Sequence, residues 1–532
     1  MAAIVTSNFR VLNANNFKED VQDNSVYVAI GKSDVWSLTT SDTTDTTPFT
    51  PNDHLEDLGE SRGNLIGMKK VASSDLSHII PRHTWTSGNS YYAWDSNDGS
   101  IFDKAFYIIT SEFKVYKCIK AGGGQSTIQP TQTLTDPQTE SDGYIWKYMY
   151  TTGVSDAEKF LVNSYMPVKT VSLGAEAVVA ATTSSSTTVT LTAGNLDILA
   201  GMTVAGTNVS GTPTVSAVNG NVLTLSAPQT LTAADILTFT FATDAAAEAS
   251  LTEPDFAQYL NQKASRDSST AAGIERIEVT AGGTGYTDGS GLSIVTISGD
   301  GTGATATANV SSGIVTGINI VNKGTNYTQA DIVISDGSGS DATARAVIAP
   351  KAGHGVDPRT ELGGFFMSLN VQLDGADGNG DLTVGNDFRQ ITLLKNPRLY
   401  NATPLAGAIA SADTLKATNY LDFVSAVDVT DYSVDELLVG QTSGAQAYVV
   451  EIDASSGYIH YHQNSKTGFK NFSNGENVQG QTSTTTGALE SSNAVGNPEV
   501  DRQSGEVLFL ENRDPINRTT TQIEDIKVIL EF

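Results

Sequence analysis

The stretch that decides the fold is residues 501–532 at the carboxyl end, which read DRQSGEVLFLENRDPINRTTTQIEDIKVILEF. The apolar run 507–510 predicts a strand that is buried on both faces. In residues 526–532, Ile526, Val528, Leu530 and Phe532 alternate with Lys527, Ile529 and Glu531, which predicts a second strand. Between the two strands, residues 511–514 and Pro515 predict a polar loop. Because a terminal strand cannot bury its apolar face alone, we expect it to complete a sheet that begins far upstream.

The composition limits the classes of partner. With 532 residues, the chain is long enough for about three or four domains. Acidic residues outnumber basic ones by 59 to 31, and the formal net charge is −28. Because binding to phosphates requires clustered Lys and Arg, we expect no nucleic-acid partner and no polybasic membrane contact.

The single cysteine, Cys118, excludes a disulfide framework within the chain and a zinc site built from several cysteines. We interpret it as a packed thiol in a strand over residues 114–120. The first residues lack the pattern of a secretory signal, and no apolar run approaches the length of a membrane span. We therefore expect no membrane insertion, and assembly in a reducing cytoplasm.

Abrupt changes in composition predict a mainly β, discontinuous multi-domain protein, in which small all-β modules interrupt an α+β frame. Residues 170–262 contain no Lys or Arg and consist of short alternating Thr- and Val-rich runs, which predicts an all-β module. Insertions of this kind are tolerated at loop tips because lengthening a loop costs little closure entropy. The predicted frame comprises residues 1–169, 351–412 and 497–532, and the predicted modules are 170–265, 266–350 and 413–496.

Two of these modules contain internal repeats. Residues 276–287 (RIEVTAGGTGYT) return as 317–328 (GINIVNKGTNYT), so module 266–350 is predicted to hold two β units of about forty residues. In module 413–496, VGQTSGA at 439–445 is echoed by QGQTS at 479–483. Within the frame, we expect a helix over 13–21, a strand over 26–30 and a hairpin formed by 105–110 and 114–120.

Six motifs of the frame resemble the baseplate wedge subunit of T-even-like contractile-tailed phages, the gene-product-eight family. They occur in the family's order, and the resemblance covers roughly half of the chain. The motifs are AIVTSNFR at 3–10, IGKSDVWS at 30–37, IPRHTW at 80–85, DGYIWKY at 142–148, FRQITLLKNP at 388–397 and SGEVLFLENRDP at 504–515.

The resemblance implies a non-enzymatic, β-rich virion protein of the tail baseplate that forms a homodimer and binds other wedge proteins. The three repetitive stretches depart from shorter family members, so contacts near them cannot be carried over. They resemble Gly- and Thr-rich modules of other phage structural proteins.

Several stretches could suggest chemistry, but simpler structural interpretations are favoured. GGTGYT at 282–287 lacks a following Lys and a helix pattern, so we favour a β-turn over a phosphate loop. DSNDG at 95–99 lacks calcium-loop spacing and is predicted to be a solvent-facing turn. His460 and His462 are expected on an exposed strand face, and His354 in a structural hydrogen bond. We therefore predict no catalytic residues, no metal site and no cofactor.

The residues most suited to a partner interface are aromatic. A strand over 144–150 is predicted to place Tyr144, Trp146, Tyr148 and Tyr150 on one face, where core packing is the favoured alternative to an interface. Arg513 is predicted to bind a carboxylate, either within the chain or across an interface.

These features together favour a structural subunit of a baseplate wedge that assembles by protein–protein contacts. The alternative is a carbohydrate- or receptor-binding phage protein that uses the inserted β modules for adhesion.

Overall fold

The computed structural model describes residues 4–42, 44–269, 271–374, 382, 384–400, 408–425, 429–519 and 522–532. The chain forms two compact units. Unit 1 contains Met1–Glu19, Ser77–Ser368 and Ile529–Phe532, and unit 2 contains Asp20–Leu76 and Leu369–Val528.

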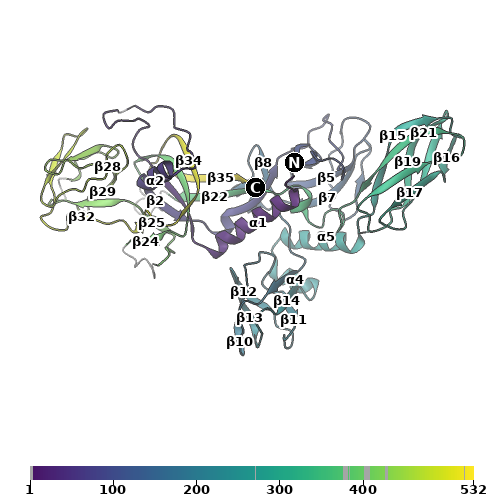
Figure 1. The fold of residues 1–532 in the computed structure, drawn as a ribbon, viewed down its shortest axis with the longest axis horizontal. Helices are drawn as coiled ribbons and strands as arrows, with labels where there is room; N and C mark the ends of the chain where they lie inside the picture. Colours follow the sequence, from purple (N-terminus) through teal and green to yellow (C-terminus); the bar gives the residue numbers. More distant parts are fainter. Residues whose placement is uncertain are drawn as a thin grey trace. The chain divides into compact units, whose positions relative to one another are not determined.

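Strands dominate both units, which confirms the predicted mainly β, multi-domain architecture (Figure 1). The described α-helices are α1 (Ser7–Asp23), α2 (Leu55–Gly63), α3 (Val154–Phe160), α4 (Asp244–Ser250), α5 (Asp255–Ser268) and α6 (Pro358–Glu361). Two short 3₁₀ helices cover Ser73–Asp75 and Ile101–Asp103. Helix α1 contains the predicted 13–21 helix but starts earlier, because the Thr6 hydroxyl accepts a hydrogen bond from the Phe9 amide and caps its first turn.

A five-stranded sheet in unit 2 joins segments that are far apart in the sequence. Its order is β25 (Thr414–Lys416), β2 (Leu65–Lys70), β1 (Val26–Gly31), β23 (Asp387–Lys395) and β34 (Glu506–Asn517). The predicted strand at 26–30 is thus confirmed as β1. Every residue of β1 is buried, because β1 has neighbours on both sides and a continuous apolar sequence.

The predicted polar loop at 511–515 is wrong, because β34 continues through it as a twelve-residue strand. Pro515 is tolerated there because β34 lies at the edge of the sheet, where its missing N–H disrupts no ladder. The same edge position leaves Leu508 38% exposed, so residues 507–510 are not buried on both faces. The second predicted strand is confirmed as β35 (Ile523–Glu531), in which Ile526 and Val528 are buried.

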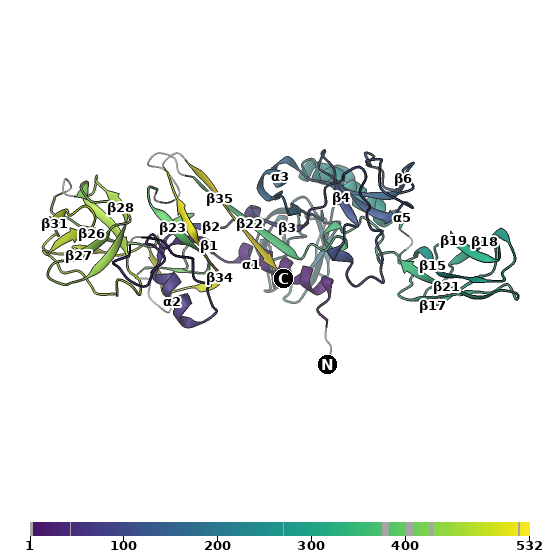
Figure 2. The same ribbon diagram turned by 90° about the horizontal axis from the view of Figure 1, so that it is seen from above.

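Unit 2 also contains the module predicted at 413–496, which forms a seven-stranded sheet (Figure 2). Its order is β31 (Thr486–Ala488), β30 (Asn477–Gly480), β27 (Leu437–Gly440), β28 (Gln446–Asp453), β29 (Tyr458–His462), β26 (Asn419–Asp422) and β32 (Val495–Gly496). A two-stranded sheet pairs β24 (Arg398–Leu399) with β33 (Val500–Asp501).

The repeat in this module consists of two turns that cap each other. Glu476 accepts hydrogen bonds from the amides of Thr442 and Ser443 in the first copy of the GQTS motif. Glu436 accepts the equivalent bonds from the amides of Thr482 and Ser483 in the second copy. Each repeat therefore supplies the carboxylate that satisfies the turn of the other.

In unit 1, a four-stranded sheet consists of β4 (Tyr107–Ile109), β5 (Lys114–Lys120), β7 (Ile145–Thr151) and β6 (Gln138–Thr139). Strands β4 and β5 pair antiparallel, which confirms the predicted hairpin. A further sheet, which is not confined to unit 1, has the order β35, β22 (Phe366–Asp374), β3 (Leu76–Pro81) and β8 (Tyr165–Pro167).

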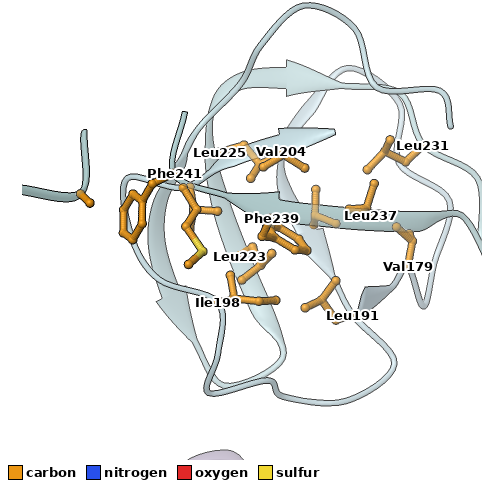
Figure 3. Close-up of a cluster of buried hydrophobic side chains, with 14 of the residues drawn as sticks. Val179, Leu191, Ile198, Val204, Leu223, Leu225, Leu231, Leu237, Phe239 and Phe241 are labelled. Carbon is orange, nitrogen blue, oxygen red and sulfur yellow. The ribbon is translucent and has the colours of Figure 1, made fainter. Parts of the chain in front are cut away.

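Residues 171–259 form a core of their own (Figure 3). It lies between two three-stranded sheets, and its centre contains Leu223, Leu237 and Phe239. The first sheet has the order β10 (Ser186–Thr190), β13 (Val222–Gln229) and β12 (Val215–Asn219). The second has the order β11 (Thr203–Gly206), β14 (Ile236–Thr240) and β9 (Ala175–Val178). Helix α4 lies within the predicted module 170–265, and helix α5 begins in it and ends beyond it, so the prediction of an all-β module is wrong for its last part.

The module predicted at 266–350 folds into two sheets. The first has the order β15 (Ile274–Thr284), β21 (Ser340–Ile348), β20 (Ala330–Ile334) and β17 (Val295–Gly299). The second has the order β16 (Gly289–Leu292), β18 (Thr305–Ser311) and β19 (Ile314–Asn322). The two repeats bury equivalent tyrosines, Tyr286 and Tyr327. Gly282 lies inside β15. The Asp336 carboxylate accepts hydrogen bonds from the backbone amides of Thr287, Ser338 and Gly339, so a carboxylate of the same chain holds the end of the Gly-rich segment 282–287.

The predicted frame segments contribute residues to both units. The described modules have hydrophobic clusters within 171–259, 274–348 and 421–494. That these modules interrupt one discontinuous frame domain stays a prediction.

Candidate functional site

The predicted aromatic face lies on β7, and a β-bulge divides it. Tyr148 pairs with Tyr116 on β5, and Tyr150 pairs with the adjacent residue Val115, so one additional β7 residue has no counterpart. Because a bulge reverses the alternation of side chains beyond it, Tyr150 packs in a different cluster from Tyr144, Trp146 and Tyr148. The prediction that all four rings share one face is therefore wrong for Tyr150.

All four aromatic side chains are buried within the chain. The hydroxyl groups of Tyr144 and Tyr150 each donate a 2.8 Å hydrogen bond to a backbone carbonyl, and the Tyr148 hydroxyl lies 2.8 Å from that of Thr151. The ring of Trp146 stacks on that of Tyr144 with centroids 5.6 Å apart. Their surroundings correspond to the core-packing alternative, and a role at a partner interface stays a prediction.

Arg513 has an exposed side chain on the edge strand β34. Its side chain is 45% exposed, and its Nε lies 3.4 Å from a carboxylate oxygen of Glu511 on the same strand. Its backbone carbonyl accepts a 2.7 Å hydrogen bond from the indole of Trp36. The contact with Glu511 corresponds to the within-chain alternative for Arg513, and it leaves much of the guanidinium accessible.

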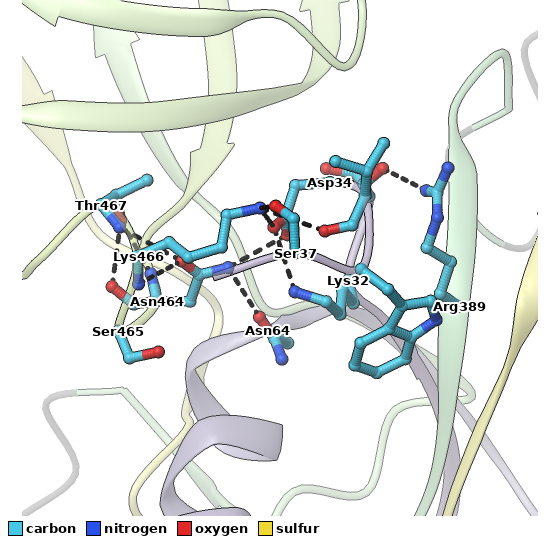
Figure 4. Close-up of polar contacts among 12 residues, drawn as sticks. Lys32, Asp34, Ser37, Asn64, Arg389, Asn464, Ser465, Lys466 and Thr467 are labelled. Atoms are coloured by element: carbon cyan, nitrogen blue, oxygen red, sulfur yellow. Dashed lines mark hydrogen bonds and ion pairs between the residues drawn. The ribbon is translucent and has the colours of Figure 1, made fainter. Parts of the chain in front are cut away.

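A buried polar cluster in unit 2 surrounds Asp34, which follows β1 (Figure 4). The Asp34 carboxylate lies 3.0 Å from Nζ of Lys32 and 2.7 Å from Nζ of Lys466, and it accepts a 3.0 Å hydrogen bond from Asn464. The side chain of Asp34 is fully buried, and the two lysine side chains are about 5% exposed or less. We call these four residues the Asp34 network.

Opposite charges offset the burial of this carboxylate. Burial alone would raise the pKa of Asp34, but the charges of Lys32 and Lys466, joined at low pH by that of protonated His462, lower that pKa below its usual value. Burial lowers the pKa of His462 to about 4, so its ring is neutral near pH 7. The Asp34 network therefore joins the segment after β1 to the loop after β29 through ionised side chains.

His462 and His460 differ from the prediction of an exposed strand face, because both are buried. Nε2 of His462 lies 2.9 Å from the Ser33 hydroxyl, and Nδ1 of His460 lies 3.2 Å from the Thr418 hydroxyl. Strand β29 lies between β28 and β26, which explains why its side chains have little access to solvent.

Arg389 forms a second set of contacts in unit 2. Its guanidinium makes a two-pronged contact with Asp45, through Nε at 2.9 Å and Nη2 at 2.8 Å, and Nη2 also contacts Asp387 at 3.0 Å. The guanidinium also donates to the Ser33 carbonyl. The paired contact is the bidentate geometry that arginine favours, and it fixes the loop at residue 45 against β23.

These polar residues were not identified from the sequence. The motifs at 30–37 and 388–397 contain Lys32, Asp34 and Arg389, but the patterns gave no indication that Asn464 and Lys466 are their neighbours. The available signal was the presence of charged residues directly after a wholly apolar strand, where burial requires a partner.

In unit 1, Cys118 and His354 are both buried. Burial raises the pKa of the Cys118 thiol, consistent with the predicted packed thiol. The ring of His354 contacts Trp94 edge to face, but its two nitrogens have no hydrogen-bond partner among the residues that the structure describes. The structural hydrogen bond predicted for His354 is therefore not found.

The turn predicted at 95–99 is present, but Asp95 is buried and pairs with Arg345. Within the described ranges, no group of three or more His, Cys, Asp or Glu side chains is arranged to hold a metal ion. None of the helices in the described part of the chain has the length and apolar character needed to cross a bilayer.

Comparison with known proteins gives a family match at the amino-terminal end of the chain and one curated relative. A family model described as bacteriophage T4 Gp8 matches residues 3–127, a region that contains β1, β2 and Asp34. The baseplate wedge protein gp8 of Enterobacteria phage T4 is 25% identical in an alignment of 185 residues, and the match covers 28% of this chain and 55% of the T4 protein. The chain thus spans about half of the length of that relative. The resemblance predicted from the sequence motifs is confirmed, and this chain is similar to the baseplate wedge subunits of T4-like phages.

Proposed function

We propose that this protein is a structural, non-enzymatic subunit of a phage tail baseplate wedge. It is located in the virion, at the baseplate of a contractile tail, and it assembles in the host cytoplasm by contacts with other wedge subunits. The observation that carries the proposal is the match of the Gp8 family model to residues 3–127.

The surface of unit 1 supports a role in protein contacts. Four large apolar side chains at and before the start of α1 are at least 50% exposed: Ile4, Val5, Phe9 and Leu12. Scattered exposed apolar residues are ordinary, but several within nine residues of one segment are typical of a surface that another protein covers. The acidic net charge also favours specific contacts over non-specific association.

The direct test is to find the protein in tails. We expect antibodies against this chain to label purified virions at the end of the tail distal to the head, and mass spectrometry of isolated baseplates to detect it. An antibody against the major capsid protein is the control for accessibility. Labelling confined to the head, or absence of the chain from isolated baseplates, would contradict the proposal.

We further propose that the chain forms a homodimer through a self-complementary interface, as the resemblance implies. Sedimentation equilibrium at micromolar concentration is then expected to give twice the mass of 55.9 kDa. A monomer at every concentration up to about 100 μM would refute the dimer while leaving the baseplate location untouched.

Among the predicted interface residues, Arg513 is the one whose side chain is accessible, and we propose that it contacts a carboxylate of a neighbouring wedge subunit. The variant Arg513→Ala is expected to enter baseplates less efficiently than the unmodified chain while it folds normally. A matched control is Arg266→Ala, which removes an arginine that is also 45% exposed. Equal incorporation of both variants would refute this contact.

The alternative function, binding of a carbohydrate or a receptor through the inserted modules, has no specific supporting observation in the described part of 170–350. The large hydrophobic side chains that the described part of 170–350 exposes are aliphatic: Ile236, Leu260, Ile314, Val321 and Val333. A flat aromatic surface on which a sugar ring could stack is therefore not evident there.

A further inference from the structure

A polar cavity of about 750 Å³ lies within unit 2, between the loop after β1 and strands β27 and β28. Its walls include five aspartates and one arginine, which are Asp34, Asp42, Asp45, Asp387, Asp435 and Arg389. Glu436 and Tyr448 also line it. The volume lies within the range of small-molecule pockets and is much larger than a bare ion requires.

Most charges around this cavity are already compensated. Asp34 contacts two lysines, Arg389 contacts both Asp45 and Asp387, and Glu436 accepts backbone amides. Asp435 differs, because its Oδ2 accepts only a 3.1 Å hydrogen bond from the Asp387 amide and its Oδ1 has no partner among the described residues. The lining therefore has more negative charge than positive charge to offset it.

A second unsatisfied group lines the same cavity. The side chain of Tyr448 comes from β28, the residue is 5% exposed, and its hydroxyl has no hydrogen-bond partner within the described ranges. A buried hydroxyl without a partner costs free energy comparable to a lost hydrogen bond. Asp435 and Tyr448 thus present an acceptor and a hydroxyl that the rest of the chain does not use.

We propose that this cavity binds a guanidinium or alkylammonium group, with the Asp435 carboxylate as its counter-ion and the Tyr448 hydroxyl as an acceptor. A metal ion fits less well, because Ca²⁺ and Mg²⁺ need six or more converging oxygens and the described residues hold no group of three acidic or histidine side chains placed for a metal. An organic cation needs fewer direct ligands and fills more of the volume. The group could belong to a free polyamine or to an arginine or lysine side chain of a neighbouring protein.

Binding of a cation is expected to depend on the ionisation of Asp435. Burial raises the pKa of Asp435 to about 7, and the nearby carboxylates of Asp387 and Asp34 act in the same direction while Arg389 opposes them. Asp42, Asp45 and Glu436 also face the cavity. If the cation binds only the ionised form, apparent affinity falls in proportion to the ionised fraction, about 30-fold between pH 8 and pH 5.5.

The experiment uses the full chain and N-acetyl-arginine-methylamide as the probe, measured by calorimetry at pH 8 and pH 5.5. The neutral citrulline analogue has nearly the same shape and is the matched control ligand. We expect the arginine probe to bind, to bind about 30-fold more weakly at pH 5.5, and to exceed the citrulline analogue by at least about tenfold.

Two variants test the residues. Asp435→Asn keeps the shape of the side chain and is expected to weaken binding at pH 8 by at least about tenfold and to remove its pH dependence. Tyr448→Phe is expected to weaken it severalfold, which provides a second test if Asp435→Asn is poorly folded. Asp53→Asn changes an exposed aspartate that does not line the cavity and is expected to leave binding unchanged.

Spermidine and N-acetyl-lysine-methylamide distinguish the two sources of the cation. Tighter binding of spermidine supports a free polyamine, whereas tighter binding of an amino-acid probe supports a side chain from a neighbouring protein. Failure of every cationic probe to bind at about 10 mM, or binding that Asp435→Asn and Tyr448→Phe leave unchanged, would overturn the proposal.

Discussion

Replacement of Asp34 by Asn is the sharpest perturbation of the buried polar contacts in unit 2. The substitution keeps the shape of the side chain but leaves the ammonium groups of Lys32 and Lys466 without the carboxylate that lies 3.0 Å and 2.7 Å away. Because both lysine side chains are at most 5% exposed, water replaces this carboxylate only poorly. Breaking a buried ion pair by removing one partner costs about 3–5 kcal/mol, whereas an exposed pair contributes at most about 1 kcal/mol.

Native-state hydrogen exchange read by mass spectrometry is the suitable assay, because a chain with several cores does not unfold in one step. A loss of 3 kcal/mol or more in local stability corresponds to exchange at least about 100-fold faster for amides in β29 and the loop 463–468. Asp53→Asn, at an exposed position, is the matched control and is expected to change stability by less than about 0.5 kcal/mol.

A double substitution separates the charge contact from general damage. Adding Lys466→Met to Asp34→Asn removes one of the two stranded charges, so the double variant is expected to lose less stability than the two single variants summed, by more than about 1 kcal/mol. Exchange rates in Asp34→Asn that match those of Asp53→Asn would refute the reasoning, and so would strictly additive effects.

Four further predictions follow from individual groups. Since burial lowers the pKa of His462 to about 4, the unfolded state binds an extra proton between about pH 6.5 and pH 4. Stability around β29 is therefore full above pH 6.5 and falls by roughly 3 kcal/mol towards pH 4. Hydrogen exchange is expected to show a smaller loss in the variant His462→Phe. For Asp435 the pH dependence is reversed, because its pKa is raised to about 7 in the folded protein: the folded state is favoured below about pH 4 and loses stability as the pH rises to 7. Asp435→Asn is therefore expected to stabilise the chain at pH 8 by at most about 4 kcal/mol and to have little effect at pH 4, as measured by thermal melts. A Cβ on Gly480 would lie 2.4 Å from side-chain oxygens of Glu436 and Ser483, so Gly480→Ala is expected to lower the local stability of β30 by about 1–3 kcal/mol, measured by hydrogen exchange. The control Gly317→Ala places its Cβ where nothing lies within 4 Å and is expected to lower stability little. Equal effects of the two variants would argue against the reciprocal caps. Gly59 lies inside α2 and a Cβ there meets nothing within 4 Å, so Gly59→Ala should stabilise the helix by about 0.5–1 kcal/mol, and slower exchange of α2 amides is the measurable result.

The sequence predicted those features that depend on local patterns. Continuous apolar residues gave β1, alternating residues gave β35, and the short polar turn 111–113 gave the β4–β5 hairpin. The repeats in 266–350 and 439–483 were visible because each copy keeps the residues of its turn.

Features that depend on neighbours distant in sequence were not predictable in the same way. The bulge that moves Tyr150 to another cluster arises from the pairing of β7 with β5, and no residue in 144–150 signals it. Pro515 indicated a loop, but the edge position of β34 allows the strand to continue. Asp34 and Lys466 lie more than 400 residues apart, so charge alone could not pair them.

A three-dimensional electron cryo-microscopy reconstruction of intact tails tests the baseplate assignment most directly. The proposed function predicts density that fits the five-stranded sheet of β25, β2, β1, β23 and β34 within each wedge of the baseplate, in contact with other subunits. A map of comparable detail in which every wedge density is explained by other proteins, with this chain found in the sheath, head or fibres, would contradict it.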